Sequence, residues 1–120
     1  MRTDLVMLGC QALQVAVPET PEELLAGWRM MPAGLRAMLF DLRPFAPIVP
    51  LWVPIAVGKD AEPLDVVWCE HGIVTAIATI RAGCLQGFSD QVLELPADFC
   101  ADIGIHVGDR LVVGNGARGH

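Results

Sequence analysis

The chain has 120 residues, of which 53% are hydrophobic and 18% charged, and its formal net charge is −6. This length suits one domain with a buried core, so we predict a single domain over 1–120, and the composition excludes a disordered chain. An acidic surface repels phosphate groups, so we expect neither a nucleic-acid partner nor binding to a membrane surface.

The first predicted element is a strand over 13–17, where the order Leu-Gln-Val-Ala-Val alternates in the way expected of a half-buried strand. Pro18 ends this pattern. We expect 1–12 before the strand, and 114–120 at the other end of the chain, to be peripheral. The apolar run before Cys10 is too short for a secretion signal, which indicates a cytoplasmic protein, although a signal already removed would leave the same sequence.

A helix over about 20–30 is predicted next. Thr20 is a favourable N-cap residue, Pro21 suits the first helical position, and Glu23 stands where a capping box needs an acid. Gly27 is a poor helix residue, and a close approach of sheet backbone would explain its presence.

The rest of the chain predicts short strands separated by turns. Glu70, His71 and Gly72 join two β-branched runs as a three-residue hairpin with glycine in the left-handed position. Strands are expected at 37–42, 51–57, 64–69, 73–80, 91–95 and 106–113, with a loop over 81–90 and a short helix over about 96–103. The fold class is therefore α+β and mainly β, a small barrel-like antiparallel or mixed sheet.

Four cysteines stand at positions 10, 69, 84 and 100, and no two of them form a Cys-x-x-Cys pair. This spacing lacks the usual zinc and thioredoxin patterns, so we expect reduced thiols, no metal and no cofactor. Cys69 and His71 are two residues apart and could share one face of a strand, but a hairpin tip at His71 would break that alternation. His106 is expected to be an exposed strand residue.

Four short sequence motifs, in a fixed order along the chain, resemble those of a known family. They are Thr20-Pro-Glu-Glu leading to Gly27, then Met38-Leu-Phe, Pro63-Leu-Asp, and Gly104-Ile-His-Val-Gly-Asp, which ends at Asp109. Their order and spacing resemble the domain of unknown function 192 family of small bacterial and archaeal proteins, over roughly 13–113. The resemblance implies a small β-rich barrel that carries a helix, and it implies no particular reaction.

The departures from the family pattern fall on its polar positions. Ile55, Ala56 and Val57 replace the family's Asn-Thr, and Met30 and Met31 stand where a basic residue is usual. The sequence motifs whose apolar residues are expected to form the core are retained. This pattern predicts a divergent member that keeps the fold and has altered or lost a ligand site.

Asp65 and Trp52 are the best candidates for a ligand site. Asp65 is a carboxylate at the start of an apolar strand, and its alternative role is to bond turn amides. Trp52 could line a small-molecule pocket or pack in the core. Gly108 and Asp109 are expected to form a structural turn in which the carboxylate caps backbone amides.

No catalytic residue is assigned, because no nucleophile has a base in a suggestive sequence context. The first hypothesis is therefore a non-catalytic module that binds a small ligand or a peptide near Trp52 and Asp65. The second is a hydrolase or transferase with Asp65 as general base. The third is a structural homodimer, suggested by a mean hydropathy of +0.48, which is high for a domain in water.

Overall fold

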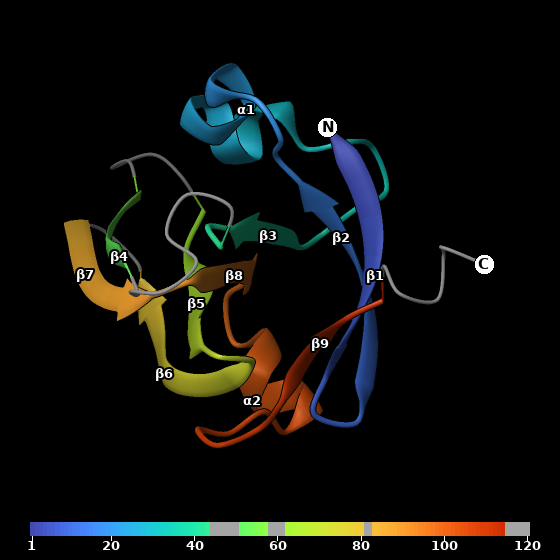
Figure 1. Ribbon diagram of the computed structural model, residues 1–120, viewed down its shortest axis with the longest axis vertical. Helices are drawn as coiled ribbons and strands as arrows, with labels where there is room; N and C mark the ends of the chain where they lie inside the picture. Colours follow the sequence, from blue (N-terminus) through green and yellow to red (C-terminus); the bar gives the residue numbers. More distant parts are fainter. Residues whose placement is uncertain (44–50, 58–61, 81–82, 115–120) are drawn as a thin grey trace.

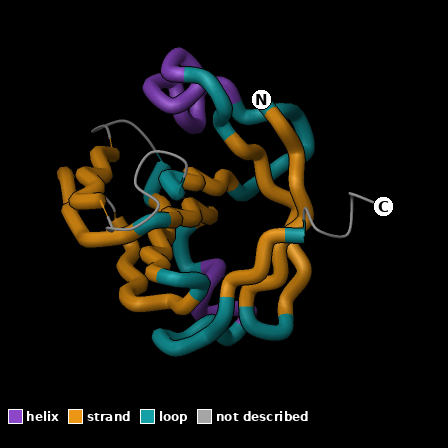
Figure 2. The backbone as a smooth tube through the Cα atoms, viewed as in Figure 1, coloured by secondary structure: helices purple, strands orange, loops and turns teal. Residues whose placement is uncertain are grey.

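The computed structural model describes 1–43, 51–57, 62–80 and 83–114 (Figure 1), and for 51–57, 83–88 and the three residues Leu25, Arg29 and Met30 it describes the backbone alone. The elements in chain order are β1 (Arg2–Leu8), β2 (Gln11–Val17), α1 (Pro21–Ala26), the 3-10 helix η1 (Gly27–Met30), β3 (Met38–Asp41), β4 (Leu51–Val57), β5 (Leu64–Glu70), β6 (Ile73–Ile80), β7 (Gly83–Ser89), β8 (Gln91–Pro96), α2 (Phe99–Ile103) and β9 (Leu111–Val113). Strands dominate and the helices are short (Figure 2), which confirms the predicted α+β, mainly β class.

Seven strands form one curled sheet in the order β6-β5-β8-β3-β2-β1-β9, and β4 pairs with β7 in a separate two-stranded sheet. β2 and β3 are parallel, because α1 and η1 lie between them in the chain and supply the crossover. All other described strand pairs are antiparallel. The sheet is therefore mixed, as predicted.

The two edges of the seven-stranded sheet meet at a seam. Ile73 at the start of β6 forms an isolated antiparallel bridge with Arg110, just before β9. Three backbone hydrogen bonds of 2.8 Å support this bridge: Leu111 N–H to the Gly72 carbonyl, Val74 N–H to the Asp109 carbonyl, and Gly108 N–H to the Val74 carbonyl. The bridge curls the sheet into a half-barrel.

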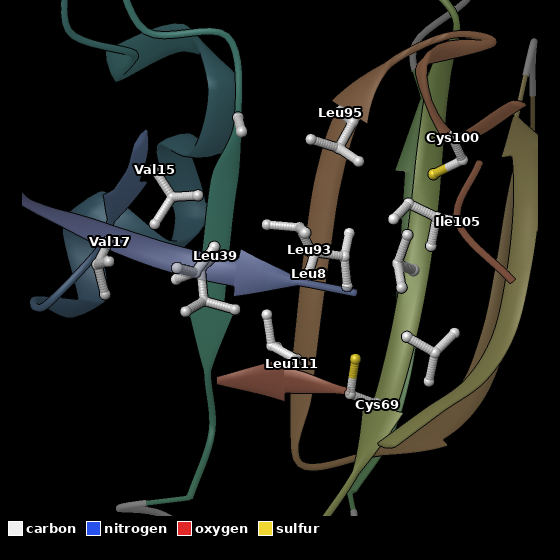
Figure 3. Close-up of a cluster of buried hydrophobic side chains, with 14 residues drawn as sticks. Leu8, Val15, Val17, Leu39, Cys69, Leu93, Leu95, Cys100, Ile105 and Leu111 are labelled. Carbon is white, nitrogen blue, oxygen red and sulfur yellow. The ribbon is translucent and has the colours of Figure 1, made fainter. Parts of the chain in front are cut away.

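The interior of the half-barrel holds the main core, built by the alternation of side chains along each strand. Figure 3 shows Leu93 and Leu95 of β8 facing Leu39 of β3, with Cys100 of α2 at one end and Leu111 of β9 near the other. A second cluster lies on the opposite face of the sheet and consists of Val66, Trp68, Ile80 and Val92, with Phe40, Leu64 and Ala78 packed against it.

The predicted capping box is present. Thr20 Oγ1 accepts the Glu23 N–H at 3.2 Å, and Glu23 Oε1 accepts the Thr20 N–H at 3.4 Å. The helix predicted at about 20–30 is observed as α1 followed by η1. Gly27 joins them with φ of 55°, a left-handed value that explains the glycine; its nearest neighbour is the Phe40 ring, so the predicted approach of sheet backbone is wrong.

Three expectations about the strands and termini also require correction. Residues 1–12 are not peripheral, because β1 pairs with both β2 and β9 and buries Val6 and Leu8 in the core. The loop expected at 81–90 contains strand β7. The hairpin turn has two residues, not three, because Glu70 pairs with Ile73 and both residues between them, His71 and Gly72, are left-handed. Of the tail expected at 114–120, 115–120 lies outside the described residues.

The region around Gly108 is a turn, as expected, with φ of 97° at the glycine. Asp109 Oδ2 accepts the His106 N–H at 2.8 Å, so its carboxylate caps the turn. His106 is exposed, but it lies in this loop, and the strand expected over 106–113 is reduced to Leu111–Val113.

Candidate functional site

Asp65 is buried, and its carboxylate holds two segments of the chain together. Its Oδ1 accepts the Thr79 hydroxyl at 2.7 Å and the Asp98 N–H at 2.9 Å, and its Oδ2 accepts the Cys100 N–H at 2.9 Å. Burial alone would raise the pKa of Asp65, but these hydrogen bonds outweigh it and lower the pKa below the usual value. Both oxygens are thus occupied in joining β5 to α2.

Trp52 lies in β4, opposite Phe88 of β7 in the two-stranded sheet. Its side chain lies outside the described part of the structure. Asp65, in contrast, belongs to the seven-stranded sheet and is bonded to β6 and to the start of α2. A ligand site shared by Trp52 and Asp65 therefore stays a prediction.

Cys69 and His71 do not share a face. The Cys69 side chain belongs to the main core, and burial, followed by the charge of Asp90, raises the pKa of its thiol to about 12. His71 is exposed on the left-handed turn, so the alternation of the strand has ended before it. Within the described residues, no three His, Cys, Asp or Glu side chains gather in a way that could hold a metal ion.

A cavity of about 670 Å³ opens beside the seam of the half-barrel. We call it the mouth cavity. It lies at the end where β3, β5 and β9 finish and β8 begins. Its lining residues come from β3 and the residues after it, the β5–β6 turn, the start of β8, and β9; they are Asp41, Arg43, His71, Gly72, Asp90, Gln91, Leu111 and Val113.

Two buried side-chain atoms, on two residues that line the mouth cavity, have no hydrogen-bond partner among the described residues. They are Asp90 Oδ1, an acceptor, and Gln91 Nε2, a donor. Asp90 is only 7% exposed and Gln91 only 1%. A buried polar group without a partner costs about 1–3 kcal/mol, so each atom marks a place where a ligand or a water would supply the missing partner.

The segment 89–91 that carries these atoms is held from several sides. The Ser89 hydroxyl accepts the Cys69 N–H at 3.0 Å and lies within hydrogen-bonding distance of the carbonyl oxygens of Cys69 and Gln91. The Asp90 backbone bonds to Cys69 and Leu42, and its Oδ2 accepts the His71 N–H at 3.2 Å. The site is thus preorganised by contacts with β5 and with the residues after β3.

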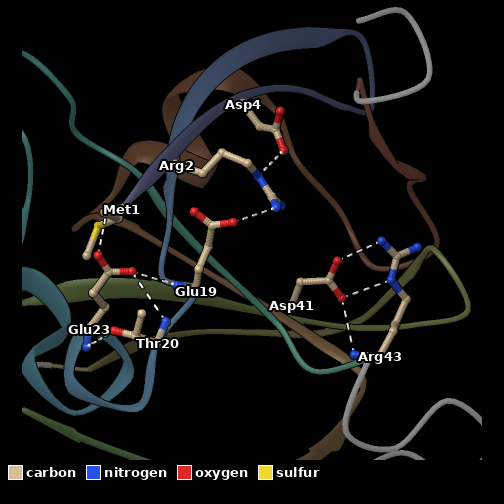
Figure 4. A network of polar contacts seen from close by, with 8 residues as sticks. All are labelled: Met1, Arg2, Asp4, Glu19, Thr20, Glu23, Asp41 and Arg43. Atoms are coloured by element: carbon tan, nitrogen blue, oxygen red, sulfur yellow. Dashed lines mark hydrogen bonds and ion pairs between the residues drawn. The ribbon is translucent and has the colours of Figure 1, made fainter. Parts of the chain in front are cut away.

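An ion pair forms one wall of the mouth cavity. Arg43 Nε and Nη2 donate to the two carboxylate oxygens of Asp41 at 2.9 and 2.7 Å, a bidentate arrangement that Figure 4 shows. The hydrogen bond with Asp41 raises the pKa of Arg43 against the effect of burial, and the charges of Asp41 and Asp90 add to the rise. Since Asp41 and Arg43 neutralise one another, the carboxylate of Asp90 dominates the charge of the cavity.

A second unusual carboxylate lies on the opposite face of the sheet. Glu94 in β8 is 7% exposed, and burial raises its pKa to about 7, with the nearby Trp28 indole partly opposing the rise. The indole nitrogens of Trp28 and Trp68 are buried and make no hydrogen bond of good geometry in the described structure. Trp28 also lines a separate cavity of about 600 Å³ with Leu64 and Pro96.

Sequence reasoning did not identify the mouth cavity. One signal was available: Gln91, Leu93 and Leu95 alternate along a strand, so Gln91 must face the core with the two leucines. A core-facing glutamine at the start of an apolar strand is unusual, and it marks a polar site. The partner Asp90 could not be found because 81–90 was expected to be a loop.

Comparison with known family models and curated proteins found no match. Two solved structures share the fold, both with a TM-score of 0.71. One is a "putative transcription regulator" from Sinorhizobium meliloti 1021, with 22% identity over 94% of this chain and 95% of that one. The other is a protein of unknown function from Novosphingobium aromaticivorans, with 20% identity over 92% of this chain and 84% of that one. The resemblance to the domain of unknown function 192 family stays a prediction.

Proposed function

We propose that this protein is a non-catalytic binding module that takes a small polar ligand in the mouth cavity. The observation that carries the proposal is that two residues lining this cavity, Asp90 and Gln91, each hold a buried polar atom without a partner, Oδ1 and Nε2. An acceptor and a donor that both lack partners are complementary to a primary carboxamide, which offers N–H donors and a carbonyl acceptor in one small group. The volume lies within the roughly 300–1,000 Å³ typical of ligand sites.

The apolar walls support the same kind of ligand. Leu111 and Val113 line the mouth cavity beside the polar atoms, so a ligand with a short aliphatic part would bury it there. The location of Asp65 favours this site over an enzyme with Asp65 as general base, because both oxygens of Asp65 already accept hydrogen bonds.

The test is a titration of ¹⁵N-labelled protein with acetamide, followed by NMR. We expect the side-chain amide signals of Gln91 and the backbone signals of Asp90 and His71 to shift with one common dissociation constant. Gln91→Leu should abolish these shifts without loss of stability, because it removes a buried donor that has no partner. Gln11→Leu, at an exposed position on β2, is the matched control and should leave binding unchanged.

A water that bridges Asp90 and Gln91 is the competing explanation, since buried waters commonly satisfy such atoms. In that case acetamide would leave the signals of Gln91 in place up to the highest concentration used, and the proposal would be rejected.

A homodimer is the second candidate, and one surface patch favours it. Leu5 on β1 is 52% exposed and Val112 on β9 is 54% exposed, and Met7, directly opposite Val112 in the pairing of these strands, is exposed as well. Sedimentation equilibrium would test this candidate. We expect Leu5→Lys to dissociate a dimer and Val107→Lys, on the loop before β9, to leave it intact; a wild-type protein that sediments as a monomer would exclude it.

A further inference from the structure

The seam between the hairpin and β9 ends before β9 does. Along the seam, 108–111 pairs with 72–74, and the last hydrogen bond joins the Leu111 N–H to the Gly72 carbonyl at 2.8 Å. At Gly72 the β5–β6 hairpin turns, with φ of 53° at His71 and 76° at Gly72. β9 continues to Val113 and therefore extends past the tip of the hairpin.

The backbone of Val113 faces the open side. Arg110 and Gly114 direct their backbone groups toward β1 and the turn after it. The Gly9 N–H donates to the Arg110 carbonyl at 2.8 Å, and the Gly114 N–H donates to the Leu5 carbonyl at 2.7 Å. Backbone groups alternate in direction along an antiparallel strand, so those of Leu111 and Val113 point away from β1. Leu111 N–H is taken by Gly72, whereas Val113 N–H and C=O have no partner within the described residues.

These free backbone groups adjoin the mouth cavity, which Val113 itself lines together with Asp90 and Gln91. The residues that line this space thus carry two donors and two acceptors: Val113 N–H and C=O, and the buried Gln91 Nε2 and Asp90 Oδ1. An extended peptide presents alternating donors and acceptors on both of its edges, and it is the common ligand that matches such a set.

We propose that the mouth cavity binds an extended peptide segment, one residue of which pairs with the backbone of Val113 while the N–H and C=O of the next residue, which point to the opposite edge, meet Asp90 and Gln91. This inference rests on the function proposed above and specifies the ligand class. The peptide takes the place beside β9 that the hairpin leaves empty. Its side chains pack on Leu111 and Val113, so small aliphatic residues suit the cavity.

No free terminus or charge of the peptide is required. Asp41 and Arg43 are paired with one another, so they do not call for a charged partner. Asp90 accepts an N–H donor, which every peptide group except that before proline supplies. A peptide blocked at both ends is therefore the appropriate probe, and N-acetyl-Ala-Ala-Ala-N-methylamide presents four peptide groups in a short chain.

The experiment compares three probes on ¹⁵N-labelled protein by NMR: the blocked trialanine, its analogue in which every alanine is N-methylated and the C-terminal group is a dimethylamide, and acetamide. We expect the blocked trialanine to shift the signals of both Val113 and Gln91, and to bind more tightly than either of the others. The N-methylated analogue lacks the donors for Val113 C=O and Asp90, and should bind at least about tenfold more weakly, because two hydrogen bonds are lost.

A pair of variants tests the role of Val113 from the side of the protein. Val113→Pro removes the N–H that faces the open edge, a position where a strand tolerates proline, whereas Val113→Ala keeps it. We expect Val113→Pro to weaken binding of the trialanine about tenfold relative to Val113→Ala and to leave acetamide binding unchanged. Should Val113→Pro not fold, the comparison with the N-methylated peptide still decides the question.

The outcomes separate the two proposals. If acetamide and the trialanine shift Gln91 with equal affinity and Val113 does not respond, the cavity binds a small ligand and the peptide proposal is overturned. If no probe moves Gln91, the proposed function itself fails. If the signals of Val113 move with protein concentration in the absence of peptide, the occupant of the edge is a second copy of the chain, which also overturns the peptide proposal.

Discussion

The carboxylate of Asp65 accepts the backbone N–H of Cys100 at 2.9 Å, across 35 residues of sequence. The same carboxylate accepts the Asp98 N–H just before α2, so one side chain on β5 satisfies two donors at the start of this five-residue helix. Asp98 itself has φ of 68° and provides no side-chain cap. Asp65 therefore does for α2 what an N-cap residue does for other helices.

Asp65→Asn is expected to lower the free energy of unfolding by about 1.5–3 kcal/mol, because at least one backbone N–H would then face an NH₂ group. Since the pKa of Asp65 is lowered in the folded state, its stabilisation is present at neutral pH and is lost as the pH falls through the folded pKa. Urea denaturation at pH 7 and at pH 3 measures both effects. An equal loss at the two pH values would contradict the role given to the charged carboxylate.

Thr20→Ala tests the capping box of α1. The hydroxyl of Thr20 accepts the Glu23 N–H at 3.2 Å, and its loss should destabilise the protein by about 0.5–2 kcal/mol. Thr20→Ser keeps the acceptor and is the matched control. A urea midpoint for Thr20→Ala equal to that of Thr20→Ser, with the same slope, would show that the cap contributes nothing to stability.

Gly114→Ala tests how closely β9 approaches β1. A Cβ at Gly114 would lie 2.5 Å from the carbonyl oxygen of Leu5, and a backbone atom cannot move aside as a flexible side chain can. We expect a loss of about 1–3 kcal/mol, as for overpacked core positions, with the hydrogen-exchange protection of Met7 and Val112 reduced first. Unchanged protection of these two amides would show that β1 and β9 accommodate the added methyl group without loss of stability.

The thiols are expected to react in a fixed order. Cys10 is exposed, whereas Cys69 and Cys100 are buried, and burial raises the pKa of each of these two to about 12. Because the thiolate is the reactive form, iodoacetamide at pH 7.5 should alkylate Cys10 in the native protein and reach Cys69 and Cys100 only after unfolding. Peptide mapping by mass spectrometry measures this order, and early labelling of Cys69 would contradict the packed core.

The sequence predicted the elements whose signals are local. The capping box at Thr20 and the strands at 51–57 and 73–80 were located because propensity, alternation and capping chemistry act over a few residues. β7 was missed because Gly83 and Gly87 are unfavourable in strands, and its pairing with β4 comes from distant sequence. β1 was missed because Asp4 interrupts its apolar positions, although that side chain is buried and bonded to Arg2.

The candidate site was less predictable, because its parts meet only after folding. Asp65 was correctly singled out as a carboxylate in need of partners, but its partners Cys100 and Asp98 lie more than thirty residues away. The mouth cavity depends on where the hairpin turn falls relative to the end of β9. A hairpin turn placed earlier in the chain would lengthen β6 along β9 and cover Val113, and no local pattern fixes that register.

Glu94 provides the last prediction, a dependence of stability on pH near neutrality. The carboxylate lies on the sheet face opposite the main core, where its neighbours across the strands are Met38 and Val66 and its nearest polar group is the Trp28 indole. Burial raises its pKa from 4.5 to about 7, so the folded state holds a proton that the unfolded state releases above about pH 4.5.

The sign follows from this difference in bound protons. Between pH 4.5 and 7 the folded state binds more protons than the unfolded state, so the free energy of unfolding falls as the pH rises, by about 3 kcal/mol in total, and then levels off above pH 7. Glu94→Gln cannot ionise and should lose this slope. The stability of the variant minus that of wild type should therefore be larger at pH 8 than at pH 5. Urea denaturation at half-unit steps from pH 5 to 8 measures the slope, and Glu22→Gln, at an exposed position on α1, is the matched control. A wild-type slope that persists in Glu94→Gln would assign the titration to another group.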